Sequence, residues 1–210
     1  MGKMINTNLK EFISGYSIEV IPKTVVKTKS FGDILPKSTR VYLAHLKDAD
    51  ITEMVAAAKN LNDDGFKVMP HIPARVIKNQ VMLSDWLSMY QNEAGVDEAL
   101  LLAGGSHEPI GDYDSSIQLI ESGLFDKAGF KRLHVAGHPE GNADIDPDGG
   151  IKNVSEALSW KQEFLKRTDA KMAIATQFCF DANTVKKWAD DIKQDGIDIP
   201  IHIGVAGPAK

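Results

Sequence analysis

The sequence is poor in the features that mark several special classes of protein. It has one cysteine among 210 residues, which excludes an internal disulfide framework and a cysteine-based zinc site. Its longest apolar runs are far shorter than the roughly 20 residues that span a bilayer. The net charge of −5 gives no electrostatic footprint for nucleic acid or for an anionic membrane. We therefore expect a cytoplasmic protein that binds neither nucleic acid nor membrane.

The composition is that of an ordinary globular protein. Apolar residues make up 43% and charged residues 25% of the chain. A chain of 210 residues can bury one substantial core. Residues 1–15 form a polar lead-in, and we assign residues 16–210 to a single domain.

Short apolar runs alternate with helical patterns along most of the chain. Such alternation predicts βαβ units with parallel strands, because each crossover returns the chain to the same end of the sheet. The seven predicted strands are Ser17–Ile21, Val41–Leu46, Phe66–Ile72, Glu98–Ala103, Arg132–Gly137, the run that opens at Met172, and Pro200–Val205.

The carboxyl ends of these strands carry polar or small residues. Polar groups at the same end of every strand favour a (β/α)8 barrel of the TIM type over an open sheet, in which the site occupies one crevice. Such a barrel needs an eighth strand, and none follows Pro200–Val205 in this sequence. We expect a fragment of a longer protein, with closure by a second copy or an exposed edge as the alternatives.

Capping residues predict where helices begin. Asp50 and Asn153 precede helical patterns, with Glu53 and Glu156 at capping-box spacing, and Asp181 is a good N-cap for the pattern after the sixth strand. The basic connection between the first two strands is too weakly periodic to predict a helix.

Each candidate site residue has a structural interpretation and a functional one. Glu19 could lie on a solvent face or point into a barrel mouth. Gly104 and Gly105 could form a tight turn, or let a phosphate or a flat ring approach the backbone closely. Gln177 could cap its own strand or hydrogen-bond to a planar heterocycle. We interpret Cys179 as a small buried apolar residue.

Histidines at the strand ends leave a metal site open as an alternative. Four of them fall at strand ends, and imidazoles on a barrel rim can bind zinc or iron; they are His45, His71, His107 and His138. The chain has no His-x-His pair, and no carboxylate stands at a tight ligand spacing from a histidine. The loop from Asp144 to Gly149 also lacks the full calcium-loop pattern.

Several strand ends carry the residue patterns of one known family. Ser17–Pro22, which contains Glu19, is similar to the family's pattern S-F-E-F-F-P-P. His71–Arg75 is similar to its H-L-T-C-R stretch, and Leu102–Gly105 to its L-R-G-D turn. Tyr113–Ser115 matches a following Tyr-x-Ser pattern.

The second half of the chain carries the closest matches. Gly137–Asn142 is similar to the family's A-Y-P-E-x-H segment. Ala175–Asp181, reading A-T-Q-F-C-F-D, nearly repeats its signature I-T-Q-F-F-F-D. Gly196–Val205 matches G-I-x-x-P-I-x-x-G-I. On these motifs the chain resembles methylenetetrahydrofolate reductase, a flavin-dependent barrel enzyme.

This resemblance implies an activity and a set of site residues. The reaction would be reduction of 5,10-methylenetetrahydrofolate to 5-methyltetrahydrofolate in one-carbon and methionine metabolism. Electrons would pass through FAD from NAD(P)H or an electron-donor protein, in an expected homo-oligomer. Glu19 would be the catalytic acid, and Gln177 and Phe178 would hold the pterin. The residues that would line FAD are His71, Gly104, Gly105, Tyr113, Ser115, His138, Asn142 and Lys161.

Four departures from the family pattern lie beside the expected flavin. Gly105 and Ala103 replace the acid and the arginine of L-R-G-D. His138 and Asn142 replace the tyrosine and the histidine of the A-Y-P-E-x-H segment. Such changes alter the charge around a flavin and hence its redox potential or its donor. Two alternatives stay open: a flavin-free barrel that binds folate or handles its methyl group, and a histidine-rich metal-dependent hydrolase.

Overall fold

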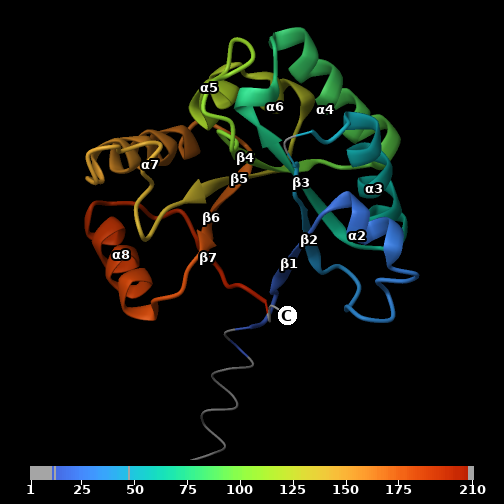
Figure 1. Cartoon of the computed structure of the whole chain (residues 1–210), viewed down its shortest axis with the longest axis horizontal. Helices are drawn as coiled ribbons and strands as arrows, with labels where there is room; N and C mark the ends of the chain where they lie inside the picture. The colour runs from blue at the N-terminus through green and yellow to red at the C-terminus, as the bar shows by residue number, and fades with distance from the viewer. Residues whose placement is uncertain (1–10, 12, 47, 208–210) are drawn as a thin grey trace, which may run out of the picture. The chain divides into compact units, whose positions relative to one another are not determined.

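The structure is a computed structural model that describes residues 11, 13–46 and 48–207 (Figure 1). Two compact units divide it: Met1–His71 with Met89–Val96, and Ile72–Ser88 with Asp97–Lys210. We call them unit 1 and unit 2 and describe each by itself. Most of the predicted lead-in, residues 1–10 and 12, lies outside the described residues.

All seven predicted strands are present, and they follow one another in chain order. The strand pairs within each unit are parallel, as predicted. The strands are β1 (Ser17–Val20), β2 (Arg40–Leu43), β3 (Lys67–Pro73), β4 (Glu98–Leu102), β5 (Arg132–Gly137), β6 (Lys171–Phe178) and β7 (Ile201–Gly204). The α/β class is therefore confirmed. The described residues contain no eighth strand, so the closed barrel stays a prediction.

Helices connect the strands, as expected for βαβ units. They are α2 (Pro22–Lys27), α3 (Ile51–Asp63), the short 3₁₀ helix η1 (Ala74–Val76), α4 (Gln80–Ala94), α5 (Ser116–Glu121), α6 (Leu124–Ala128), α7 (Lys152–Leu165) and α8 (Ala182–Gln194). No described helix combines the length and the apolar character needed to cross a membrane.

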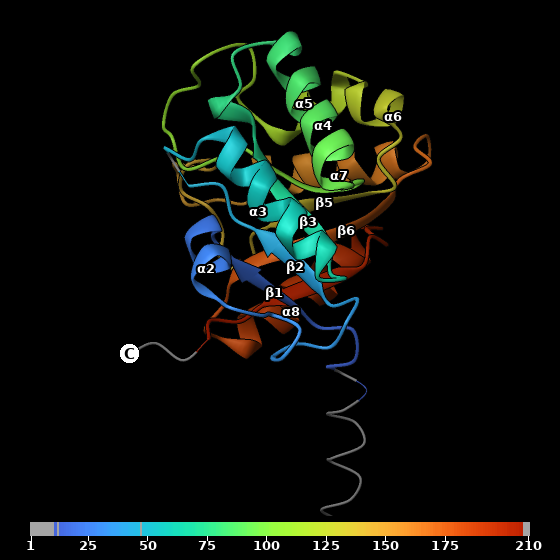
Figure 2. The same ribbon diagram turned by 90° about the vertical axis from the view of Figure 1, so that its right-hand side faces the viewer.

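In unit 1 the helices α2 and α3 lie side by side, and α3 contacts β2 (Figures 1 and 2). The core beneath them contains Val41 and Leu43 from β2 and Met54 from α3, all fully buried. The helix α3 begins as predicted, because the Asp50 carboxylate accepts the Thr52 backbone N–H at 2.7 Å. This N-cap fixes the connection between β2 and β3.

The helix α2 was not predicted, and its composition explains why. Val25 is its only buried residue, so there is no apolar stripe for a periodicity argument to detect. Pro22 occupies its first turn, where a missing N–H costs nothing. The helix α6 was not predicted either, because its five residues are too few to show a helical period.

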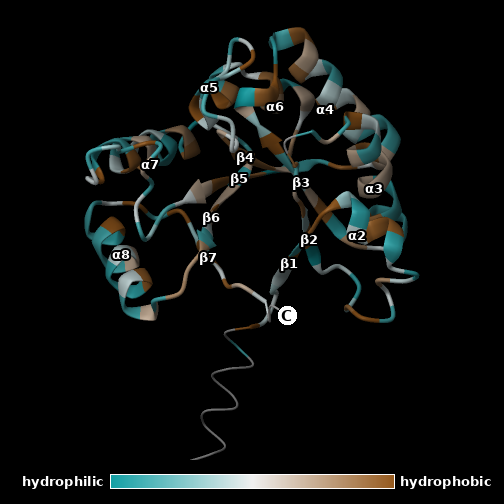
Figure 3. Cartoon of the chain, viewed as in Figure 1, coloured by the Kyte–Doolittle hydropathy of each residue, from teal (hydrophilic) through white to brown (hydrophobic). Residues whose placement is uncertain are grey.

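In unit 2 the strands β4 to β7 pair in order and are covered by amphipathic helices. Figure 3 shows apolar and polar residues alternating along α8, whose Val185 and Ile192 are buried. Gly137 at the end of β5 admits this packing. A Cβ there would lie 2.4 Å from Cγ2 of Ile174 and 3.2 Å from the Trp188 ring. Only glycine at this position lets Ile174 of β6 and Trp188 of α8 pack this closely against the end of β5.

The sequence predicted two helix N-caps in unit 2, and the structure confirms one of them. The Asp181 carboxylate accepts the Asn183 backbone N–H at 3.0 Å, so the predicted cap of α8 is confirmed. The predicted Asn153 cap of α7 is wrong. Its N-cap is Ile151, and Asp146, only 3% exposed, accepts the Asn153 N–H at 2.9 Å and the Val154 N–H at 3.1 Å. A cap supplied from an upstream loop leaves no capping-box pattern in the sequence.

Candidate functional site

One polar cluster lies in unit 1 and consists of Glu19, Tyr42, His45 and His71; we call it the β1–β3 cluster. Glu19 is paired in register with Tyr42, and Tyr42 with Met69. His71 is two residues beyond Met69 on β3, so strand alternation places it on the same face as Glu19. The alternation of three neighbouring strands therefore assembles this cluster.

A carboxylate and an imidazole meet within the β1–β3 cluster. Oε2 of Glu19 lies 3.3 Å from Nε2 of His71, although the two groups are not aligned as a hydrogen bond. The Glu19 side chain is 42% exposed and that of His71 only 13%. The Tyr42 ring meets His71 edge-on, with centroids 6.4 Å apart. The carboxylate can therefore reach solvent or a ligand while the imidazole supports it from inside.

His45 adds a second imidazole to this cluster. Burial lowers the pKa of His45, and the positive charge of His71 lowers it further. His45 is consequently neutral near pH 7. A carboxylate beside two imidazoles is an arrangement that can hold and pass on a proton.

The two glycines after β4 differ in what they permit. Gly104 has a φ of +105°, and a Cβ there would lie 3.1 Å from Cβ of Pro73. A Cβ at Gly105 would meet none of the described residues within 4 Å. The tight-turn interpretation thus accounts for Gly104. The backbone at Gly105 is exposed and has open space beside it. A ligand could therefore approach it closely, as the functional interpretation requires.

Arg75 is the main residue of unit 2 that the sequence did not reveal. Its guanidinium is buried, and Nε donates to Oδ1 of Asp114 at 2.6 Å. Nη1 donates to the Ser106 carbonyl at 2.8 Å and to Oδ2 of Asp144 at 2.6 Å. The Arg75 backbone N–H donates to the Ala103 carbonyl at 2.9 Å. One side chain therefore ties together the loops that follow β3, β4 and β5.

The electrostatics of Arg75 explain its stability in this position. Burial lowers its pKa, but the hydrogen bonds to Asp144 and Asp114 outweigh that loss and leave the pKa raised. Bonds of this kind are charge-assisted and stronger than neutral ones. Arg75 is a scaffold for the carboxyl-end loops, with its donors directed at the protein itself.

Tyr113 and Ser115, two predicted flavin contacts, also have structural roles. Tyr113 is only 8% exposed, and burial together with the charge of Asp112 raises its pKa. Ser115 is the N-cap of α5, and its backbone N–H donates to Oε1 of Gln118 at 3.1 Å. Both residues help to shape the loop between β4 and α5.

A second polar cluster lies in unit 2 at the carboxyl ends of β5 and β6. It consists of His138, Asn142, Lys161 and Gln177; we call it the β5–β6 cluster. Nδ2 of Asn142 lies 3.4 Å from Nδ1 of His138, and Gln177 is close enough to His138 to influence its pKa. The structure thus brings together four of the predicted site residues.

A register break in β6 turns Gln177 and Phe178 outward. The pairing with β7 shifts between Ala175 and Phe178, and Oγ1 of Thr176 accepts the Gly204 backbone N–H at 2.8 Å. Irregularities of this kind can re-aim side chains at sheet edges and beside active sites. Gln177 is exposed, and Phe178 is 54% exposed. The ring and the carboxamide are therefore both available to a ligand.

Lys161 is the most unusual member of the β5–β6 cluster. It is 6% exposed, and burial lowers its pKa to about 8. Within the described part of the chain its ammonium makes no hydrogen bond and no ion pair. Burial also lowers the pKa of His138; the Gln177 hydrogen bond raises it, and the Lys161 charge lowers it. The cluster thus contains a buried amine without a counter-charge.

Cys179, which follows Phe178, is half-buried rather than enclosed as predicted. Its Sγ lies 3.0 Å from the Gln177 carbonyl and 3.6 Å from Oγ1 of Thr176. It supports the turn that follows β6.

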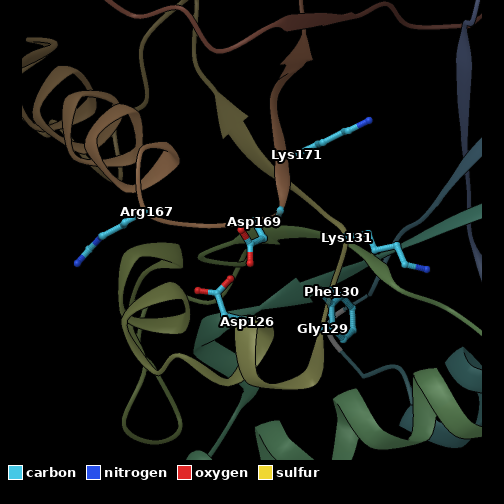
Figure 4. A pocket seen from close by; sticks show the side chains of 8 residues that line it. Asp126, Gly129, Phe130, Lys131, Arg167, Asp169 and Lys171 are labelled. Atoms are coloured by element: carbon cyan, nitrogen blue, oxygen red, sulfur yellow. The ribbon is translucent and has the colours of Figure 1, made fainter.

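A cavity of about 420 Å³ lies at the other end of the same strands (Figure 4). Its lining residues precede β5 and β6; they are Asp126, Gly129, Phe130, Lys131, Arg167, Asp169, Ala170 and Lys171. Figure 4 shows Lys131 and Lys171 pointing away from Asp126 and Asp169. Active sites of parallel α/β folds lie at the carboxyl ends of their strands. We therefore place the candidate site at the β5–β6 cluster and not in this cavity.

The predicted metal alternative gains no support from the described residues. Among them, no three histidine, cysteine, aspartate or glutamate side chains gather as a set of metal ligands. His107, one of the four strand-end histidines, has a side chain that is 97% exposed.

Comparisons with known proteins add little to this geometry. No model of a known protein family matches the chain. The crystal structure of SuiB from Streptococcus suis is similar over 88% of this chain, with 9% sequence identity and a TM-score of 0.47. That match covers 43% of the SuiB chain, so the present chain spans less than half of its length. The family resemblance of the motifs accordingly stays a prediction.

Proposed function

We propose that the protein is a flavin-dependent reductase that converts 5,10-methylenetetrahydrofolate to 5-methyltetrahydrofolate. The exposed pair Gln177 and Phe178 carries this proposal. A carboxamide offers both a donor and an acceptor to the edge of a pterin, and an exposed ring offers a face for stacking. Seven strands in chain order fit a (β/α)8 barrel whose eighth strand is not among the described residues, and we retain that architecture in the proposal.

The residues present fit the FAD that the resemblance implies. Lys161 is a buried cation without a carboxylate partner among the described residues, which suits a pyrophosphate. The open backbone at Gly105 admits a flat ring, and His138 and Asn142 supply polar contacts. When bound, the flavin would supply hydride transfer. The electron donor in this proposal is NAD(P)H or a partner protein, and the working state is a homo-oligomer.

Glu19 has the chemistry that this reaction asks of an acid. Its carboxyl group reaches solvent beside His71 and can give a proton to a folate nitrogen. That protonation opens the folate methylene bridge to an iminium, which then accepts hydride. His71, whose Nε2 lies 3.3 Å from Oε2 of Glu19, is the neighbouring group that can exchange a proton with it.

A flavin-free folate-binding protein is the second candidate, and Gly105 favours it. The resembling family has an acid at this position, and here the backbone is exposed and carries no side chain. Tyr113 and Ser115, which would contact flavin, are engaged in the protein itself. The folate contacts at Gln177 and Phe178 do not depend on these residues.

Absorbance and folate binding distinguish the two candidates. We expect purified protein to show flavin bands and to bind tetrahydrofolate. The Gln177→Leu variant should bind folate at least about tenfold more weakly, as expected for loss of a polar contact to a heterocycle. Gln194→Leu, at the end of α8, is the matched control and should bind normally. Colourless protein that binds folate would support the second candidate, and protein that binds neither ligand would contradict both.

A further inference from the structure

Lys161, which would face the pyrophosphate when FAD is bound, has a separate chemistry in the protein without that ligand. A buried ammonium is stable only with a counter-charge or hydrogen-bond acceptors, and the described residues provide Lys161 with neither. Such a group spends part of its time as the neutral amine. The lowered pKa of about 8 agrees with this conclusion. A neutral lysine amine in a desolvated site is a nucleophile.

We propose that Lys161 is a carbonyl-reactive site that captures small aldehydes as a Schiff base. The nitrogen lone pair forms a bond to the carbonyl carbon, and the C=O π pair moves to oxygen, which takes up the proton released by nitrogen. The resulting carbinolamine loses water and becomes an imine. One water leaves, and no oxidant or reductant is consumed. The proposal does not rest on the folate reaction.

The neighbours of Lys161 favour this chemistry. Burial and the charge of Lys161 both lower the pKa of His138, so the cluster also holds a neutral imidazole that can take up and return a proton during loss of water. Asn142, whose Nδ2 lies 3.4 Å from Nδ1 of His138, helps to orient that ring. Because only 6% of Lys161 is exposed, we restrict the proposal to the smallest carbonyl compounds.

Competitive labelling of the full chain tests the proposal. The protein is treated briefly at pH 7 with formaldehyde and cyanoborohydride, which reduces each imine to a methylamine. Site-resolved mass spectrometry then compares Lys161 with Lys152, a residue of the same helix whose side chain is 82% exposed. A pKa of about 8 against the ordinary value predicts on the order of 100-fold more neutral amine at Lys161.

We expect Lys161 to be methylated at least about tenfold faster than Lys152, since burial offsets part of that advantage. The advantage should vanish in urea, where both side chains are solvated. In Lys161→Met the early adduct should disappear while Lys152 is labelled as before. Labelling of Lys161 at or below the rate of Lys152 in the folded protein would overturn the proposal, and so would a preference that persists in urea.

Discussion

The β1–β3 and β5–β6 clusters both stand at the carboxyl ends of parallel strands, but they arrange charge in opposite ways. In the first, the Glu19 carboxylate faces the imidazole of His71. In the second, the Lys161 amine is buried beside His138 and has no carboxylate partner among the described residues. A compensated pair can exchange a proton without an added ligand. An uncompensated amine gains stability only from a ligand that neutralises it or reacts with it.

This difference also separates the two clusters in energy. Glu19 costs the fold little, because its side chain is 42% exposed and water can solvate the carboxylate. Lys161 loses hydration and receives nothing from the described protein in return. Destabilising groups of this kind are typical of functional sites, where binding or reactivity outweighs the loss of stability. The contrast leads to four predictions.

The largest effect is expected for Glu19→Gln in the β1–β3 cluster. Glutamine keeps the shape of the side chain but cannot supply a proton, so hydride transfer to methylenetetrahydrofolate should slow by about 100- to 10,000-fold. Flavin and folate affinities should stay within about twofold, which spectroscopic titration can check. Glu53→Gln, on the exposed first turn of α3, is the control. Normal turnover of Glu19→Gln in stopped-flow experiments would remove Glu19 from the mechanism.

The next largest effect is expected for Lys161→Met in the β5–β6 cluster. The shift of the Lys161 pKa from 10.5 to about 8 corresponds to about 3 kcal/mol. Between pH 8 and pH 10.5 the unfolded chain binds the Lys161 proton more readily than the folded chain does. The loss of stability caused by the buried ammonium is therefore complete below pH 8 and disappears as the pH rises to 10.5. Methionine should therefore stabilise the protein at pH 7 by up to about 3 kcal/mol and have little effect near pH 10.5.

Urea unfolding at both pH values measures this difference, with Lys152→Met as the exposed control. A loss of stability in Lys161→Met at pH 7 would show that the ammonium has a favourable partner in the folded protein. The two clusters would then not differ in whether their charged group has a partner.

Much of the fold could be predicted because its signals are local. Each strand is a short apolar run, and the Asp181 cap lies next to the helix that it starts. The Arg75 scaffold could not be predicted, because its partners Ser106 and Asp144 lie 31 and 69 residues away in the chain. Asp146 was hidden in the same way, since it caps α7 from a preceding loop.

The sequence indicated which residues form the candidate site but not how deeply each of them is buried. The motif resemblance selected Lys161 and His138 without any information on burial. Only packing shows that one is a desolvated amine and the other its neighbour. Ser115 shows the converse: its residue type suits a ligand contact, but its position makes it the cap of α5.

A smaller effect is expected at the glycine turn, which belongs to the same unit as the β5–β6 cluster. Gly104→Ala should cost about 1–2 kcal/mol, because alanine is strained at a φ of +105° and its Cβ would lie 3.1 Å from Pro73. Gly105→Ala should change stability by less than about 0.5 kcal/mol, because its Cβ enters open space. Denaturant midpoints with unchanged slopes would measure both. Equal costs would contradict the assignment of only Gly104 to the turn.

The smallest effects concern the one property that the two clusters share, a histidine with a lowered pKa. Folded His45 and His138 take up a proton only below 6.5, the value expected in the unfolded chain. The unfolded state therefore binds more protons just below pH 6.5, and stability falls as the pH decreases through this window. His45→Gln and His138→Gln should each lose less stability than the parent between pH 7 and pH 5, in urea titrations at both values. If only His45→Gln behaves so, burial near the Lys161 amine does not govern His138. If neither variant loses less stability than the parent, the pKa values of His45 and His138 are not lowered in the folded protein. His138 would then not be the neutral base that we assign to the β5–β6 cluster.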